Sequence, residues 1–553
     1  MWIYPLLLAV PNVALAFTEQ GPVAVKLAGI ALPLGIYYII MSCTYRIGLA
    51  VWMCLPLTFF AAFQVVLLFL YGESIIAVDM FLNVATTNVG EATELLGNLW
   101  PALTAVGLLY VLPLIWATVL LCRRARVAPG RLRPARMAGV MILAAGLALW
   151  WRSPGLEPTR DIFPVNVIDN MCTAVARTRA TALYTQTSAG FRYGASSLRP
   201  DSLREIHVLV VGETGRADHW QLLGYDRPTN PRLSRRAGLC VFSRVLSESN
   251  TTHKSVPLAL SHLTAAEYGD SIYLTRGIVS AMNEAGYRTA WLSAQARNHS
   301  LIDLFAAEAD TVDFIGDEES HPHDIDLTGP LARLIAGNPA GKLFVVLHTY
   351  GSHFNYRDRY PECYARFIPD FPTEASADNR PTLINAYDNS ILHTDAMLDS
   401  VICILDACRC PASLTYFSDH GEDIYDDPRG RFLHASPTPT VYQLHVPMAV
   451  WTSDSLAAIA PGLRPAMRSR RDAPVSSSAS VFHTLLTLAG VDTPYLRTSL
   501  SVAAPGYRPR PALYVTDRNA GVPLGQSGLR EPDFIELERR HLNENATLSA
   551  LFE

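Results

Sequence analysis

The stretch Ile-His-Val-Leu-Val-Val-Gly-Glu-Thr, residues 206–214, decides the fold of this 553-residue chain. A short apolar run without polar alternation, ended by a glycine, is typical of a strand buried on both faces. Such strands belong to parallel sheets that helices cover on either side. The sequence therefore predicts an α/β domain with a central, mainly parallel sheet. Similar strand-like runs lie at 287–293, 343–349, 413–418, 447–452 and 512–517, and helical patterns lie near 274–285, 299–308, 327–337, 384–406 and 477–489.

Polar side chains follow several of these strands where each strand ends. Glu213 follows the first strand, His353 lies shortly after 343–349, and Asp419 and His420 follow 413–418. Ligands of such sheets bind beyond the carboxyl ends of the strands. Carboxylate oxygens and imidazole nitrogens are good ligands for Zn²⁺. We therefore predict a zinc site at this edge of the sheet. We expect one tightly bound ion, and whether a second ion binds is left open. His434 lies in a nearby loop. Taken singly, each residue is explained equally well as a helix cap or a structural histidine.

A nucleophile is expected in the segment 249–257, which contains Thr251 and Thr252 ahead of an apolar helical stretch. The N-terminus of a helix favours an anion such as phosphate. A hydroxyl group there is a weak nucleophile unless a base or a metal activates it. Spacing alone leaves both threonines as candidates, and it leaves open that they only cap the helix.

The N-terminal part of the chain has the composition that is typical of a membrane domain. Residues 1–152 contain nine Lys or Arg and only five Asp or Glu. About 20 apolar residues are needed to span a bilayer as a helix. We predict a domain of five transmembrane helices over 1–152, an interfacial linker with short helices over 153–200, and a catalytic domain over 201–553. The five candidate spans are 2–17, 23–42, 47–71, 101–122 and 137–151; a cleaved signal peptide is the alternative for the first.

Six arginines between 123 and 136 place the loop between the last two spans in the cytoplasm by the positive-inside rule. The large domain is then extracytoplasmic, as is the loop 72–100, which holds four acidic residues and no basic one. Six cysteines in that large domain suggest disulfides in an oxidising compartment. The net charge of -5 provides no basic surface, so no nucleic-acid partner is expected.

The motifs in combination resemble those of the phosphoethanolamine transferases, membrane-anchored members of the alkaline phosphatase/sulfatase superfamily. That family includes enzymes of polymyxin resistance and enzymes that modify the lipopolysaccharide core. The resemblance runs over about 205–490 in order and spacing, and it extends to the five N-terminal spans. It is carried by Val211-Gly212-Glu213-Thr214-Gly215-Arg216-Ala217-Asp218, Thr252-x-x-Ser255-Val256-Pro257, His348-Thr349-x-Gly351-Ser352-His353, Tyr387-Asp388-Asn389, Ser418-Asp419-His420-Gly421-Glu422, Leu433-His434 and Phe482-His483-Thr484.

This resemblance implies roles for individual residues. Glu213, Asp419 and His420 would be zinc ligands, and Thr252 would be both the nucleophile and a ligand. His353 and His434 would bind the transferred phosphate or a second zinc ion.

The loop 72–100 adds a second group of candidate residues. Asn83, Thr87 and Glu91 are spaced i, i+4, i+8 and so share one face of a helix. The resemblance implies that they contact the head group of a lipid donor, with Glu91 near its ammonium. A solvated amphipathic helix is the alternative explanation.

The implied reaction is zinc-dependent transfer of phosphoethanolamine from phosphatidylethanolamine, through a covalent phosphothreonine-type intermediate, to an envelope acceptor. That acceptor would be lipid A, the lipopolysaccharide core or another glycan. The implied location is the bacterial inner membrane among membrane lipids, multi-pass, with the catalytic domain in the periplasm, and we expect a monomer. Two departures concern Asn250 and Leu258, where better-known members carry cysteines, and 293–298, which lacks a lysine found in some lipid A enzymes.

Three alternatives remain. A sulfatase needs an arginine two residues after the proline of its nucleophile motif, and Pro257 is followed by Leu258 and Ala259. A phosphoglycerol transferase would share fold, nucleophile and zinc but would use phosphatidylglycerol. A non-catalytic membrane sensor would have lost a ligand or the nucleophile, and none of these residues is missing.

Overall fold

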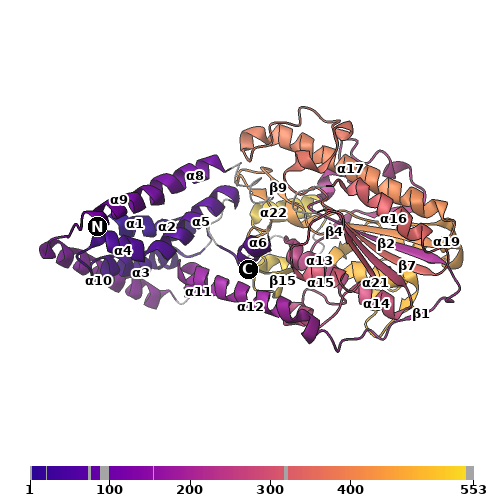
Figure 1. The fold of residues 1–553 in the computed structure, drawn as a ribbon, viewed down its shortest axis with the longest axis horizontal. Helices are drawn as coiled ribbons and strands as arrows, with labels where there is room; N and C mark the ends of the chain where they lie inside the picture. The colour runs from indigo at the N-terminus through magenta and orange to yellow at the C-terminus, as the bar shows by residue number, and fades with distance from the viewer. Residues whose placement is uncertain are drawn as a thin grey trace. The chain divides into compact units, whose positions relative to one another are not determined.

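The computed structural model describes residues 3–19, 21–71, 76–86, 99–153, 155–316 and 322–542. Its internal contacts divide the chain into two units. The helical unit comprises Met1–Ala85, Thr93–Arg177 and Asp426–Phe432, and the sheet unit comprises Thr86–Ala92, Thr178–Tyr425 and Leu433–Glu553. Figure 1 shows the elements of both units.

The sheet unit contains a seven-stranded sheet (Figure 1). Strands β8, β2, β7, β5 and β6 are parallel to one another, and β11 runs antiparallel to both β8 and β3. The predicted, mainly parallel α/β sheet is thus confirmed, with one antiparallel strand near its edge. The order across the sheet is β3 (Leu239–Phe242), β11 (Met448–Thr452), β8 (Ala412–Ser418), β2 (Glu205–Gly212), β7 (Lys342–His348), β5 (Arg288–Ser293) and β6 (Thr311–Phe314).

One predicted strand lies outside this sheet. Residues 512–517 contribute β14 (Leu513–Val515), which pairs antiparallel with β15 (Gly521–Pro523) in a separate two-stranded sheet. The apolar run was therefore correctly identified as a strand, but the expectation that it joins the central sheet is wrong. A single apolar run carries no information about which strand it will pair with.

The register brings the ends of the three central strands to one edge. Val211 of β2 lies opposite His348 of β7, and Gly212 lies opposite Ser418 of β8. The backbone N–H of Thr349 donates to the carbonyl of Val211 (3.1 Å), and that of Asp419 donates to the carbonyl of Gly212 (3.1 Å). The residues that follow the three strands therefore begin at the same level.

Helices cover both faces of the sheet, as Figure 1 shows for α17 and α21. Alternate residues of the strands, among them Leu209 and Val211 of β2, enter one apolar cluster that also contains Leu485 of α21. All eight residues of β2 are buried, which explains its unbroken apolar run. The five helices predicted here are α14 (Ile278–Glu284), α15 (Leu301–Ala306), α16 (Thr328–Ala336), α17 (Arg380–Ala407) and α21 (Ser477–Ala489).

The helical unit has three helices long and apolar enough to cross a membrane: Val23–Met41, Trp100–Cys122 and Pro129–Arg152. A fourth candidate, Ile47–Met53 with Leu55–Phe69, is bent by 60°, and Ile3–Thr18 is a shorter apolar helix. Among the described residues, at least three helices thus have the length and composition that a membrane span requires, while the predicted number of five stays a prediction. The last of these helices begins eight residues before the predicted start at 137, so it includes arginines that were assigned to a loop.

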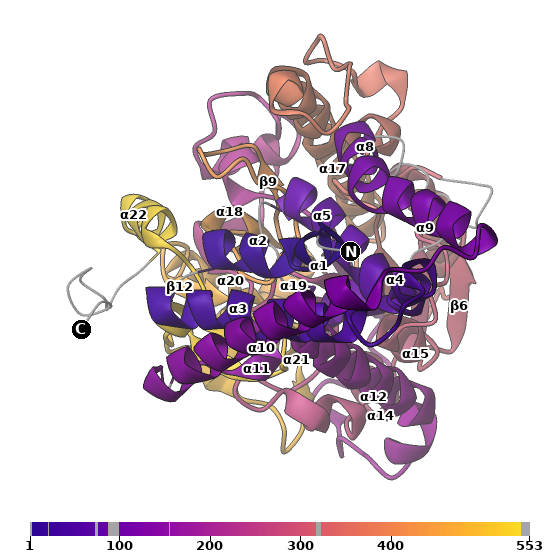
Figure 2. The same cartoon turned by 90° about the vertical axis from the view of Figure 1, so that its left-hand side faces the viewer.

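Two of these helices, α3 (Val23–Met41) and α10 (Pro129–Arg152), pack against each other along much of their length (Figure 2). Glycines permit the close approach: a Cβ atom at Gly35 would lie 2.9 Å from the carbonyl oxygen of Gly139. Small residues at such crossings are typical of helices that pack within a membrane.

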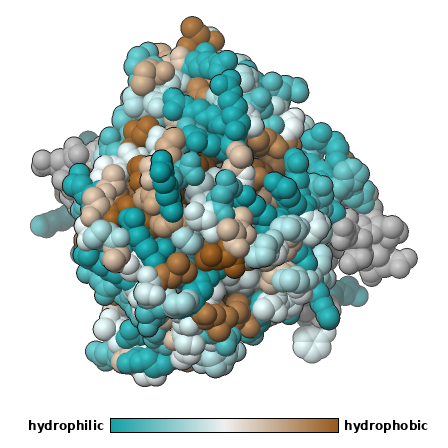
Figure 3. Space-filling model, turned by 90° about the vertical axis from the view of Figure 1, so that its right-hand side faces the viewer, coloured by the Kyte–Doolittle hydropathy of each residue, from teal (hydrophilic) through white to brown (hydrophobic). Residues whose placement is uncertain are grey.

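The two units differ in the surface that they expose. Large apolar side chains of the helical unit are open, among them Trp151 (91% exposed) and Trp116 (68% exposed). Figure 3 shows a face of the sheet unit that is mainly hydrophilic, with only small apolar patches. An apolar exterior suits a lipid environment, and a polar exterior suits water.

Two smaller expectations are wrong. The linker 153–200 contains not only the short α11 (Pro158–Asp161) but also α12 (Val165–Thr187), a helix of 23 residues. Short helices were expected because the linker contains Pro154, Pro158 and Pro164, but all three precede α12 in the sequence and so do not interrupt it. The cysteine count suggested disulfides, but all nine cysteines, each of them within the described part of the chain, have free thiols.

Candidate metal and active site

The site begins where β2 ends, at Gly212 and Glu213. A Cβ atom at Gly212 would lie 2.6 Å from the ring of Tyr416, so only glycine fits there. Thr214 has a φ of +59°, a left-handed conformation that costs a non-glycine residue of order 1–2 kcal/mol. The hydroxyl of Tyr387 donates to the Thr214 carbonyl (2.7 Å), and Asp419 Oδ1 accepts from the Thr214 N–H (3.1 Å). These two bonds hold the chain in the turn that follows Glu213.

Four of the predicted residues come together at this edge. Thr252 Oγ1 lies 3.3 Å from each carboxylate oxygen of Glu213 and 3.0 Å from Nε2 of His420. Nε2 of His420 also lies 3.3 Å from Glu213 Oε1 and 3.2 Å from Asp419 Oδ2. All four residues were predicted to form the metal-binding group.

Hydrogen bonds fix which atoms face one another. Nδ1 of His420 lies 3.0 Å from the carbonyl oxygen of Gly421, so Nδ1 carries the proton and Nε2 presents a lone pair. Asp419 Oδ1 accepts from the N–H groups of Thr214 and His420, while Oδ2 is buried and has no hydrogen-bond partner among the described residues. The site thus brings together the Nε2 lone pair of the neutral His420 ring, carboxylate oxygens of Glu213 and Asp419, and the Thr252 hydroxyl group. This donor set fits a zinc ion.

The charges of the group favour the same conclusion. Burial alone would raise the pKa of Glu213, but His420, His353 and His434 hold it below its usual range. Burial and the neighbouring Glu213 charge raise the pKa of Asp419. Burial would lower the pKa of His420, but the carboxylates of Asp419 and Glu213 raise it overall. Protons are thus held where several acidic oxygens meet, and a divalent cation would displace them.

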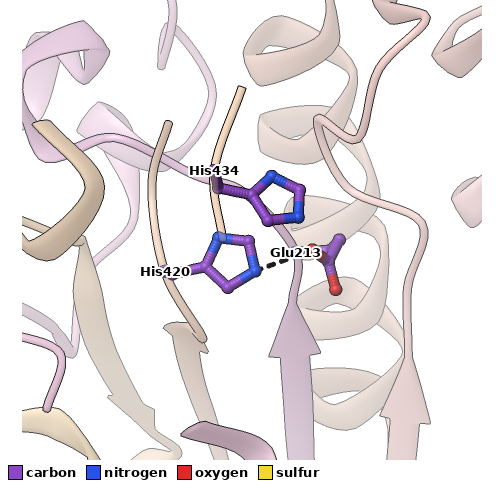
Figure 4. A group of neighbouring side chains, drawn as sticks. All are labelled: Glu213, His420 and His434. Carbon is purple, nitrogen blue, oxygen red and sulfur yellow. Dashed lines mark ion pairs between the residues drawn. The ribbon is translucent and has the colours of Figure 1, made fainter. Parts of the chain in front are cut away.

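His434 and His353 lie beside this group. Glu213, His420 and His434 bring ligand atoms within 4.8 Å of one another (Figure 4). The ring centroids of His420 and His434 are 4.2 Å apart, and those of His353 and His434 are 5.7 Å apart. Burial and the charge of His420 lower the pKa of His434, which favours the neutral imidazole that can bind a metal.

The structure distinguishes the two candidate threonines. Thr252 is the first residue of α13 (Thr252–Leu260), and its hydroxyl contacts Glu213 and His420. Thr251 is the N-cap residue, and its hydroxyl lies 3.3 Å from that of Ser249. Among the described residues, therefore, the Thr252 hydroxyl contacts the predicted ligands and the Thr251 hydroxyl does not.

Three further residues at the site were not singled out by the sequence analysis as site residues. Glu422 is buried, and its Oε2 lies 3.4 Å from Nδ1 of His434. Tyr387 holds the turn after Glu213. Asp324 accepts from the backbone N–H groups of Tyr350 and Gly351, in the loop that leads to His353. Glu422 and Tyr387 stand in motifs that carry the resemblance, although no role was predicted for either, whereas Asp324 acts through backbone atoms and leaves no local sequence signal.

The predicted lipid-contact residues are only partly described. Asn83 lies in α6 (Val78–Thr86), as a helical spacing requires, whereas Thr87 and Glu91 lie outside the described residues. Their shared helix face stays a prediction.

Comparisons with known proteins give a consistent family. The sulfatase family model matches residues 206–491. Phosphoethanolamine transferase EptC of Escherichia coli K12 is 29% identical over 325 residues, which cover 54% of this chain and 53% of the relative. The chain thus spans about half the length of the curated relatives that it matches.

Two solved structures are similar. The crystal structure of the C-terminal periplasmic domain of E. coli EptC in complex with Zn is 26% identical, has a TM-score of 0.54, and covers 61% of this chain and 97% of its own. The integral membrane protein lipooligosaccharide phosphoethanolamine transferase A of Neisseria meningitidis has a TM-score of 0.72 at 22% identity, over 92% of this chain and 99% of its own. The second likeness shows that the fold is shared along nearly the whole chain. Since the family model covers more than half of the chain, the chain belongs to the sulfatase family, within the alkaline phosphatase/sulfatase-like superfamily.

Proposed function

We propose that this chain transfers phosphoethanolamine from phosphatidylethanolamine to an acceptor in the bacterial cell envelope. The observation that carries the proposal is the position of the Thr252 hydroxyl, 3.0 Å from His420 and 3.3 Å from Glu213, at the first residue of α13. A helix N-terminus that presents a hydroxyl group beside a metal-type donor set suits attack on a phosphate ester. The relative that is 29% identical is itself named a phosphoethanolamine transferase.

Zinc is the proposed cofactor, held by Glu213, Thr252, Asp419 and His420. The donor chemistry of these four residues and the Zn in a similar domain support this choice. When bound, zinc would lower the pKa of the coordinated hydroxyl and so favour its attacking form.

The reaction then follows from the residues around it. Thr252 Oγ1 attacks the phosphorus of the donor and loses its proton, the bond from phosphorus to the diacylglycerol oxygen breaks, and that oxygen takes up a proton. Diacylglycerol leaves, and a phosphoethanolamine ester remains on Thr252. His353 and His434 lie beside the group and bind oxygens of the transferred phosphate. A hydroxyl or phosphate of the acceptor then attacks the same phosphorus and regenerates the threonine.

The helical unit supplies the lipid substrate in this proposal. We place it in the inner membrane and the sheet unit in the periplasm, as the arginines between 123 and 136 require under the positive-inside rule. Asn83, Thr87 and Glu91 would contact the head group of the donor, with Glu91 near its ammonium. A monomer suffices, since one chain contains every proposed site residue.

The acceptor is proposed as a class: lipid A, the lipopolysaccharide core or another envelope glycan. Phosphoglycerol transfer from phosphatidylglycerol is the competing activity, and a carboxylate near the head group argues against it, because phosphatidylglycerol carries no ammonium.

The test is peptide mass spectrometry of the detergent-purified, zinc-loaded chain after incubation with phosphatidylethanolamine. We expect a phosphoethanolamine adduct on the peptide 245–270 that is absent from Thr252→Ala and present in Thr251→Ala. An adduct that survives Thr252→Ala would move the nucleophile elsewhere. An adduct formed only with phosphatidylglycerol would establish the competing activity, and no adduct with either lipid would overturn the proposal.

A further inference from the structure

A cavity of about 100 Å³, lined by both apolar and polar residues, lies within the helical unit between α2 (Val10–Thr18), α3 and α11. On a comparable measure about 10–15 Å³ holds one water molecule, so the cavity has room for a group of phosphate size. Gly29 lets the walls approach, because a Cβ atom there would lie 3.1 Å from the carbonyl oxygen of Asp161. The polar residues that line the cavity are Asn12, Glu19, Lys26, Arg160 and Asp161.

Asn12 offers an unused hydrogen-bond donor in this cavity. It is only 2% exposed, and its Oδ1 accepts from the backbone N–H of Phe163 (3.0 Å). That bond fixes which end of the amide is the oxygen. The other end, Nδ2, forms no direct hydrogen bond among the residues that the structure describes, and its polar neighbour there is the Tyr37 side chain. Buried donors are rarely left without a partner, so this one indicates a missing acceptor.

Lys26 adds an unpaired positive charge. Within the described ranges its side chain forms no ion pair or hydrogen bond, although it is only partly exposed. Arg160 differs, because its guanidinium already contacts Asp161 (2.7 Å) and Glu157 (3.3 Å). The missing acceptor is therefore expected to be an anion that Asn12 and Lys26 share.

The cavity as a whole is balanced in charge. Two cations, Lys26 and Arg160, face two carboxylates, Glu19 and Asp161. A purely anionic ligand would be repelled by the carboxylates, whereas a zwitterion satisfies both signs. A phosphate beside Asn12 and Lys26, with an ammonium on the side of Glu19, matches this arrangement.

The surroundings favour a lipid over a free phosphate ester. Large apolar side chains lie open on the exterior of α2 and α3, the two helices that contribute most of the cavity lining, where acyl chains would run if this unit lies in a membrane. They are spaced i, i+4 on each helix, so each pair shares one face. These residues are Val13, Phe17, Val23 and Leu27, exposed by 38%, 84%, 71% and 50%.

We propose that this cavity binds the headgroup of a zwitterionic glycerophospholipid, at a site separate from the Glu213 group. Every residue that lines it belongs to the helical unit. The inference rests on the proposed membrane placement of that unit and not on the transfer reaction. A bound phosphate would fix the Asn12 amide, whose other end already holds the segment that leads into α12.

The experiment is native mass spectrometry of the full chain in detergent, titrated with dioleoyl phosphatidylethanolamine. Lys26→Gln removes the charge, and Asn12→Asp removes the donor while it keeps Oδ1 for Phe163. We expect each to weaken one lipid-binding event at least tenfold. Arg152→Gln, which changes an exposed cation outside the cavity, is the matched control and should bind like the wild type. Thermal unfolding establishes that each variant is folded.

Three further measurements distinguish a zwitterionic lipid from the other ligands that the cavity could bind. The event should persist in Thr252→Ala, which separates it from the transfer reaction. Glycerophosphoethanolamine and inorganic phosphate should compete at least tenfold more weakly than the lipid; equal competition would overturn the assignment to a lipid. Equal affinity for dioleoyl phosphatidylglycerol would overturn the preference for a zwitterion. Unchanged binding by folded Lys26→Gln and Asn12→Asp would overturn the site itself.

Discussion

The Nε2 atom of His420 lies 3.0 Å from the Oγ1 atom of Thr252, although 168 residues separate them in the sequence. The same nitrogen lies 3.2 Å from Oδ2 of Asp419, a buried oxygen without a hydrogen-bond partner among the described residues. Because Nδ1 of His420 donates to the Gly421 carbonyl, Nε2 of the neutral ring can accept the Thr252 hydroxyl proton or bind a metal ion. The contact between His420 and Thr252 therefore joins a proposed nucleophile to a proposed metal ligand, and Asp419 contacts the same nitrogen of His420.

Asp419→Asn should weaken zinc binding by about 100-fold or more and abolish transfer, because it removes a negative charge from the donor set. The amide oxygen can still accept from the N–H groups of Thr214 and His420, so the fold should persist. Zinc affinity is measured by competition with a chelator, and folding by thermal unfolding. Asp395→Asn is the control: Asp395 is equally buried and accepts from the N–H groups of Arg232 and Leu233. Zinc affinity equal in the two variants would contradict the assignment of Asp419.

Tyr387→Phe should reduce zinc affinity and the rate of transfer about 5–30-fold without unfolding the chain. The hydroxyl donates to the Thr214 carbonyl (2.7 Å) and accepts from the Arg216 N–H (2.8 Å), so it holds the strained turn after Glu213. Loss of these bonds leaves two buried backbone groups without partners, at a cost of about 1–3 kcal/mol.

The control for Tyr387→Phe is a buried tyrosine at the start of β2, whereas Tyr387 holds the turn that follows the end of β2. The Tyr287 hydroxyl contacts Glu205 Oε1 (2.7 Å) and the Ala489 carbonyl (3.0 Å), where β2 begins. Tyr287→Phe should lower stability by a similar amount and leave zinc affinity unchanged. If both variants lower zinc affinity alike, the role of Tyr387 is general stability.

Gly351→Ala should destabilise the sheet unit by about 2 kcal/mol or more and lower transfer at least tenfold. Gly351 has a φ of +54°, and a Cβ atom there would lie 2.4 Å from the Glu213 carbonyl oxygen. Alanine must therefore displace either the loop that leads to His353 or Glu213 itself. Gly329→Ala in α16, whose nearest contact would be 3.6 Å away, should change stability by less than about 1 kcal/mol. Similar unfolding temperatures and rates for the two variants would contradict this expectation.

The central strands could be recognised in the sequence because β2, β7 and β8 are buried throughout, so most of their residues are apolar. Their ends could be located for the same reason, which placed Glu213, Asp419 and His420 at one edge. The direction of β11 could not be predicted, since an antiparallel strand inside a covered sheet has the same apolar composition as a parallel one.

To predict that the adjacent residues Asp419 and His420 share one site, one further inference was needed, because neighbouring residues of a strand point to opposite faces of the sheet. They converge since β8 ends at Ser418 and the chain turns at Gly421, where a Cβ atom would lie 2.3 Å from the Tyr442 carbonyl oxygen. The role of Tyr387 could not be predicted. Its partners are backbone atoms of a loop more than 170 residues away in the chain, and such contacts impose no pattern on nearby side chains.

Glu248, which is not one of the proposed metal ligands, leads to a prediction about how stability depends on pH. It is 3% exposed, and Oε2 has no hydrogen-bond partner within the described part of the chain. Burial raises the pKa of this carboxyl group from 4.5 to about 8. Between these pH values the folded state holds more protons than the unfolded state, so the free energy of unfolding falls as pH rises.

Glu248→Gln carries no titrating proton and should abolish this part of the pH dependence. We expect the variant to be more stable than the wild type at pH 8, by on the order of 3 kcal/mol, and the difference to shrink toward pH 5. The measurement is thermal unfolding of the full chain from pH 5 to pH 8, with a chelator present so that zinc binding does not contribute. The exposed Glu538 on α22 (Glu531–Arg539) provides the control, because Glu538→Gln should follow the wild type at every pH. A difference between Glu248→Gln and the wild type that stays constant with pH would show that the substitution acts through packing and not through the proton of Glu248.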